Sequence, residues 1–88
     1  MDVKEAAQVA KTYVHDLFRD EGIIDLGLEE IECDGGYWRI TIGFSRPWDH
    51  NIGSVLGGKK SRAYKVVEIT DETGNVLSVK DRILPKSQ

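Results

Sequence analysis

Hydrophobic residues near the start of the chain recur at spacings of three, four and seven. The residues of this stripe are Val3, Ala6, Ala7, Ala10, Tyr13, Val14, Leu17 and Phe18. Such spacing places side chains along one side of an α-helix. Asp2 followed by Glu5 is typical of a capping box, and Gly22 suits the left-handed residue that ends a helix. The pattern predicts a helix over residues 3–20.

After residue 27 the pattern of apolar residues changes to a period of two. Residues 37–45 alternate between large apolar and polar or small side chains, which predicts a strand with one apolar face. A weaker alternation predicts a strand over 28–33, and the Asp-Gly-Gly sequence at 34–36 is typical of a tight hairpin turn. Two further strands are predicted over 62–70 and 76–84, with a glycine-containing turn between them.

The order of helix, hairpin, long connection and hairpin predicts an α+β fold. We expect the N-terminal helix to pack on one face of a four-stranded antiparallel meander, because no second helical segment exists for a parallel crossover. Cys33, in the apolar register, is predicted to be a buried thiol. The strand residues expected to contact the helix are Trp38, Ile40, Ile42, Phe44, Val67, Ile69, Leu77 and Val79.

Residues 63–77 show a family resemblance. A tyrosine-bearing strand leads through an Asp-x-x-Gly turn, Asp71 to Gly74, into a valine-bearing strand. This segment resembles the closing hairpin of PepSY-type domains, and a helix followed by an antiparallel meander is similar to the cystatin-like α+β group. The resemblance implies a cystatin-like fold, and no activity is carried over from it.

Length and composition narrow the class of protein. A chain of 88 residues, 40% hydrophobic and 31% charged, is expected to form a single domain over 1–88, with a long loop at 45–62 and a tail at 85–88. One cysteine excludes an internal disulfide and a cysteine-built zinc site. No apolar run approaches the ~20 residues of a membrane span, and residues 1–5 lack the basic-then-apolar pattern expected of an export signal. We expect a cytoplasmic protein without a cofactor.

Charged residues are segregated along the chain. Residues 20–34 contain seven acidic and no basic side chains, whereas residues 35–65 contain six Lys or Arg and one Asp. Three interpretations are open: edge-strand charges that oppose sheet-to-sheet pairing, a partner or second copy of matching charge, and nucleic acid. The net charge of −3 argues against nucleic acid.

The loop at 45–62 carries the candidate chemistry. Trp48 is either an interface anchor or a cap on the core. Asp49 and His50 would suit a general base, but no nucleophile has an identifiable place beside them, so no catalytic function is predicted. His15 falls off the helix stripe and is expected to face solvent, and the two histidines do not predict a metal site.

The function hypothesis is a non-catalytic protein-interaction module, of which an inhibitor or an immunity or antitoxin protein is one form. Its partner would be another protein or a second copy. The predicted partner-binding residues are Trp48, Tyr37, Arg39, Tyr64 and Arg46. The alternative is a small-ligand or anion-binding domain that uses Lys59, Lys60 and Arg62.

Overall fold

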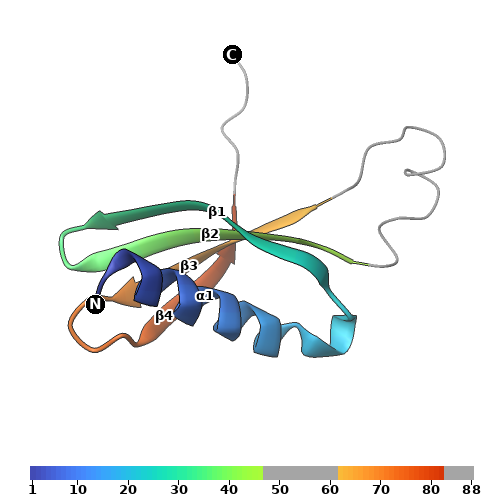
Figure 1. Ribbon diagram of the computed structural model, residues 1–88, viewed down its shortest axis with the longest axis horizontal. Coiled ribbons are helices and arrows are strands. Elements are labelled where there is room, and N and C mark those ends of the chain that lie inside the picture. Colours follow the sequence, from blue (N-terminus) through green and yellow to red (C-terminus); the bar gives the residue numbers. More distant parts are fainter. Residues whose placement is uncertain (47–61, 83–88) are drawn as a thin grey trace, which may run out of the picture.

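The architecture is one helix against a four-stranded antiparallel sheet, as the sequence predicts (Figure 1). The computed structural model describes residues 1–46 and 62–82. Within them the elements are α1 (Val3–Leu17), the 3₁₀ helix η1 (Arg19–Glu21), β1 (Ile24–Asp34), β2 (Tyr37–Ser45), β3 (Ala63–Thr70) and β4 (Val76–Asp81). The strands lie side by side in chain order, and every neighbouring pair is antiparallel.

Local signals at both ends of α1 explain its limits. The Asp2 carboxylate accepts a hydrogen bond from the Glu5 N–H at 2.8 Å, and the Glu5 carboxylate accepts one from the Asp2 N–H at 3.0 Å. This capping box satisfies two N–H groups that lack partners inside the helix. The α-helix ends at Leu17, earlier than predicted, because the chain tightens into η1. Gly22 then adopts a left-handed φ of 62°, which only glycine reaches without steric cost.

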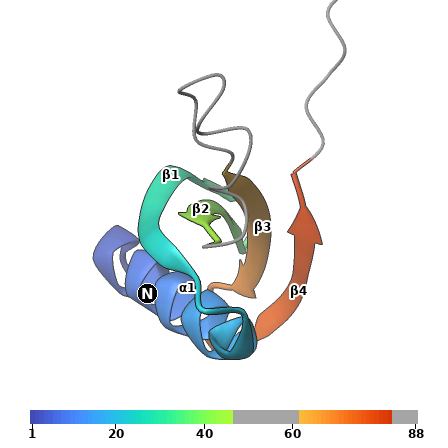
Figure 2. The same ribbon diagram turned by 90° about the vertical axis from the view of Figure 1, so that its right-hand side faces the viewer.

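The core lies between α1 and the concave side of the curled sheet (Figure 2). Helix α1 packs mainly on β1 and β2, less on β3 and least on β4. Alanines at the contact let the helix and strand backbones approach closely. The fully or nearly buried apolar residues are Ala6, Ala10, Val14, Trp38, Ile40, Ile42, Phe44, Val67 and Ile69.

Several residues of the predicted core are exposed instead. Leu77 is 51% exposed because it is the extra residue of a bulge in β4, where Val76 pairs with Ile69 and Ser78 pairs with Glu68. Three members of the helix stripe are also exposed because α1 lies off the centre of the sheet. They are Val3, Tyr13 and Leu17.

The prediction of a buried Cys33 thiol is wrong. Cys33 pairs with Trp38 on the edge strand β1, next to the hairpin turn, and its side chain is exposed. Trp38, on the neighbouring inner strand, is only 7% exposed. The alternating pattern therefore assigns Cys33 to the correct face of the sheet. The thiol is exposed because β1 is an edge strand.

The outer strands differ in length from their predictions. Strand β1 begins at Ile24 rather than at residue 28, because register shifts after Ile24 and after Leu28 break the alternation that would have revealed it. Strand β4 ends at Asp81, and residues 83–88, which include the predicted tail, lie outside the described residues.

Candidate protein-interaction site

The predicted site residues are divided between described and undescribed parts of the chain. Five candidate residues of the predicted loop lie outside the described residues. They are Trp48, Asp49, His50, Lys59 and Lys60. The remaining ones lie on or beside the central strands β2 and β3. They are Tyr37, Arg39, Arg46, Arg62 and Tyr64.

Three of these predicted residues lie on the sheet face opposite α1, but Tyr37 and Tyr64 are at opposite ends of the β2–β3 ladder. Tyr37 and Arg39 alternate with the buried residues of β2, and Tyr64 of β3 pairs with Gly43 on the same face. Tyr37 is 45% exposed, whereas Tyr64 is half-buried. This open face is therefore available to solvent around Tyr37.

Arg39 on the open face is held by carboxylates from both neighbouring strands. Its guanidinium lies 3.0 Å from the Glu32 carboxylate of β1 and 3.9 Å from the Glu68 carboxylate of β3. The hydrogen bond with Glu32 is the main reason that the pKa of Arg39 lies above its usual range. Much of the charge of this predicted contact residue is thus already satisfied within the sheet.

Arg62 makes a similar contact above Gly43. Its guanidinium lies 3.3 Å from the Glu29 carboxylate, and both groups cross the backbone of Gly43. A Cβ atom at position 43 would lie 2.8 Å from each of them. Glycine at this position therefore makes room for an ion pair that joins β1 to the residue preceding β3.

The acidic and basic segments of the sequence meet in space through such pairs. The β1 residues Glu29 and Glu32 pair with arginines of the basic segment, and Arg46 pairs with Glu21. Arg46 also lies 5.1 Å from the centroid of the Phe44 ring. The acidic and basic segments therefore form ion pairs with each other within the chain. None of the three interpretations drawn from the sequence included such pairing.

At the other end of the sheet, one carboxylate connects three parts of the chain. Asp71, in the β3–β4 turn, accepts a hydrogen bond from the Trp38 indole N–H at 2.8 Å and lies 3.2 Å from the N-terminal amine of Met1. These two contacts, the indole first, hold the pKa of Asp71 below its usual range, while the pKa of the amine is raised by Asp71. The cluster ties the start of α1 to the sheet.

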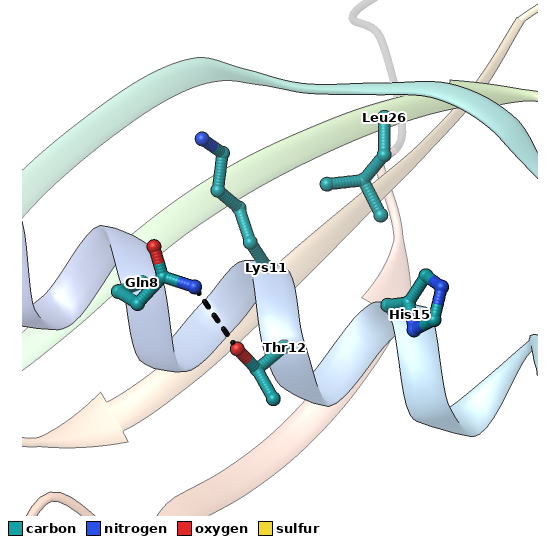
Figure 3. A pocket seen from close by; sticks show the side chains of 5 residues that line it. All are labelled: Gln8, Lys11, Thr12, His15 and Leu26. Carbon is teal, nitrogen blue, oxygen red and sulfur yellow. Dashed lines mark hydrogen bonds between the residues drawn. The ribbon is translucent and has the colours of Figure 1, made fainter.

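A polar groove lies along one flank of α1, beside β1 (Figure 3). It is an open hollow of about 310 Å³, and within it Gln8 donates a hydrogen bond to the Thr12 hydroxyl at 3.1 Å. Lys11 rises from the helix toward the strands, and Leu26 points from β1 toward the helix. The residues of this α1–β1 groove are Gln8, Lys11, Thr12, His15 and Leu26. The predicted exposure of His15 is confirmed, because its side chain is 64% exposed.

A second groove lies along the opposite flank of α1, beside β4, and exposed apolar side chains border it. Its two most exposed members are Leu17, at 54%, and Leu77, at 51%. The residues of this α1–β4 groove are Tyr13, Leu17, Val76, Leu77, Ser78 and Val79. At about 210 Å³ it is smaller than the ~300–1,000 Å³ pockets that enclose small-molecule ligands. Large apolar side chains that lie exposed along one groove are typical of a contact surface for another protein.

Sequence reasoning missed the α1–β4 groove, although two signals pointed to it. Val9 is apolar and lies outside the main stripe, yet it is one helical turn before Tyr13 and two turns before Leu17. These residues define a second apolar ridge on α1. Leu77 is the second signal, because it directly follows Val76, and neighbouring residues of a regular strand face opposite sides of the sheet.

Comparisons with known proteins add no assignment, because no protein-family model, curated protein or solved structure matches the chain. The resemblance to PepSY-type domains therefore stays a prediction. Within residues 1–46 and 62–82, no helix is long and apolar enough to cross a bilayer. The same residues contain no group of three side chains that would suit a metal ion.

Proposed function

We propose that this domain is a non-catalytic protein-interaction module that binds its partner through the α1–β4 groove. The observation that carries the proposal is the exposure of Tyr13, Leu17 and Leu77 side by side along one groove, at 43%, 54% and 51%. Large apolar side chains that gather at one place gain free energy when a partner removes them from water. An inhibitor, immunity or antitoxin role on a cystatin-like scaffold is one form of this function.

Two observations favour a protein partner over the alternatives. Of the residues proposed to bind an anion, Arg62 is described, and its guanidinium already pairs with Glu29. Arg39 and Arg46, which a nucleic acid would need for phosphate contacts, also pair with carboxylates. An anion or a nucleic acid would have to displace these carboxylates, whereas a protein that contacts the apolar side chains of the α1–β4 groove breaks no ion pair.

Capture of the partner from a lysate of the source cells tests the proposal. We expect the Leu17→Ser and Leu77→Ser variants to lose capture, because each places a hydroxyl where the partner buries apolar surface. Tyr37→Ser is the matched control, since it truncates an exposed apolar side chain on the other face of the sheet. Melting temperatures establish that the variants remain folded. If all three variants capture the partner as well as the wild-type chain does, or if only Tyr37→Ser loses capture, the α1–β4 groove is not the binding site.

A further inference from the structure

The α1–β1 groove is lined by hydrogen-bond donors, and no carboxylate lines it. Its polar side chains come from successive turns of α1, and Leu26 of β1 supplies an apolar wall (Figure 3). Donors that gather without an acidic side chain among them suit a negatively charged group better than a cation. The lining of this groove therefore favours an anion.

Lys11 is a half-buried cation without a carboxylate partner. Four Lys and Arg residues within 1–46 and 62–82 are half-buried. The three that contact a carboxylate are Arg46, Arg62 and Lys65. Lys11 makes no ion pair or hydrogen bond with any residue in these two ranges. Unlike an anion at Arg62, an anion at Lys11 would therefore displace no carboxylate.

Two carboxylates lie beside residues of the groove, and neither lines it. Asp16 lies 3.5 Å from His15 Nδ1, and its charge is offset by Arg19, whose guanidinium lies 2.9 Å away. Asp25 precedes Leu26 in β1. Among the residues that line the groove, Lys11 carries the formal charge, and this charge is positive.

Thr12 and Gln8 add two further donors next to Lys11. The Thr12 hydroxyl oxygen accepts the hydrogen bond from the Gln8 amide at 3.1 Å, so the hydroxyl proton is not used in that bond (Figure 3). The amide group of Gln8 also has a second N–H. A carboxylate or phosphate oxygen can accept from an ammonium, a hydroxyl and an amide together, because each such oxygen has more than one lone pair.

From these features we infer that the α1–β1 groove binds a small organic anion that has one oxyanion group and a short apolar part. The oxyanion contacts the Lys11 ammonium and the Thr12 hydroxyl, and the apolar part lies against Leu26. The hollow, at about 310 Å³, is at the lower end of the ~300–1,000 Å³ typical of small-molecule sites, so the ligand has few atoms. A carboxylate and a phosphate monoester share this chemistry.

This site is independent of the proposed function. It lies on the other flank of α1 from the α1–β4 groove, and the two grooves have no lining residue in common. Failure of one site therefore does not affect the argument for the other.

Titration of the ¹⁵N-labelled full chain with small anions, followed through amide chemical shifts, tests the inference. Butyrate and butyl phosphate carry the same apolar chain and distinguish the carboxylate from the phosphate, and butyramide is the neutral control. We expect saturable shifts at residues 8–15 and 26 with a Kd of about 1–10 mM for at least one of the two anions. Butyramide should bind at least about fivefold more weakly, because it lacks the charge that faces Lys11.

Substitutions of single side chains locate the anion. Lys11→Met removes the charge and keeps an unbranched side chain, so it should weaken binding at least about fivefold. Thr12→Val removes the hydroxyl and should weaken binding about threefold. Lys4→Met and Lys80→Met are the matched controls, because both lysines are exposed and neither lines the groove. Each control should change the Kd by no more than about twofold, since solvent and salt screen distant charges.

Several results would overturn the inference. The first is the absence of saturable shifts with either anion up to about 50 mM. Equal weakening by Lys11→Met and by the two controls would show a general effect of charge and no site. Equal binding of butyrate and butyramide would show that the anionic group is not recognised. The amide spectra also establish that each variant is folded, and the comparison with butyramide needs no variant.

Discussion

At the scale of single residues, Asp71 connects parts of the chain that lie far apart in the sequence. Its carboxylate connects the Trp38 side chain, which closes one end of the core, with the amine of Met1 at the start of α1. Neither contact is visible in the periodicity of the sequence, because the three residues are far apart along the chain. Asp71 was expected only to form a turn, and the structure adds this second role.

The contacts of Asp71 predict how stability depends on pH. The pKa of the Asp71 carboxyl lies below the ordinary ~3.9 of an aspartate. The ionised carboxylate therefore stabilises the folded chain fully above that pH, and this stabilisation is lost as pH falls through the folded pKa. The pKa of the Met1 amine is raised above the ordinary ~8. The protonated amine therefore stabilises the folded chain fully below pH 8, and this stabilisation is lost as pH rises through the folded pKa.

We therefore expect Asp71→Asn to flatten the pH dependence of the melting temperature at both ends. Some acid sensitivity should remain, because Asp16 and Asp81 also have lowered pKa values. Thermal unfolding followed by circular dichroism from pH 2 to pH 10 measures this, with Asp34→Asn as the control. Parallel curves for the wild-type chain and Asp71→Asn would show that the cluster does not form in solution.

At the scale of elements, the position of α1 on the sheet decides which apolar residues form the core. The helix covers β1 and β2 more than β4, and Ile40 of β2 is fully buried. Leu77 of β4 is half exposed, because it is the extra residue of the bulge in that strand. Both residues are large and aliphatic, and both were predicted to contact the helix. The structure therefore assigns them opposite roles in stability.

Alanine substitutions at these two positions measure that difference. Ile40→Ala should lower the free energy of unfolding by about 2–5 kcal/mol, because it leaves a cavity in the core. Leu77→Ala should change it by no more than about 0.5 kcal/mol, as expected for a surface position. Urea denaturation of both variants gives the two values. Similar losses would place Leu77 in the core and close the groove.

The elements also show what the sequence could and could not predict. Helix α1 and strand β2 have strong, uninterrupted periodicity, and both were found close to their observed limits. The start of β1 was missed because its bulges reset the alternation between Ile24 and Leu28. The exposure of Tyr13 and Leu17 could not be predicted, because periodicity shows which residues share a face and not how far a sheet extends beneath it.

At the scale of the whole molecule, the two faces of the sheet have different chemistry. On the open face, ion pairs such as Arg39–Glu32 and Arg62–Glu29 link neighbouring segments. Arg82, the residue that follows β4, lies 3.9 Å from the Glu30 carboxylate of β1. On the helix side, the off-centre position of α1 and the bulge in β4 leave apolar side chains exposed along the α1–β4 groove. The proposed binding function depends on this asymmetry.

Solvent exposure of individual methyl groups tests this asymmetry most directly. Methyl NMR of the free chain with a soluble paramagnetic agent measures how closely solvent approaches each side chain. The account predicts strong relaxation enhancement at the methyls of Leu17 and Leu77 and very little at those of Ile40 and Ile69. Protection of Leu17 and Leu77 equal to that of Ile40 would mean that the groove is filled in the free chain, and it would contradict the central claim.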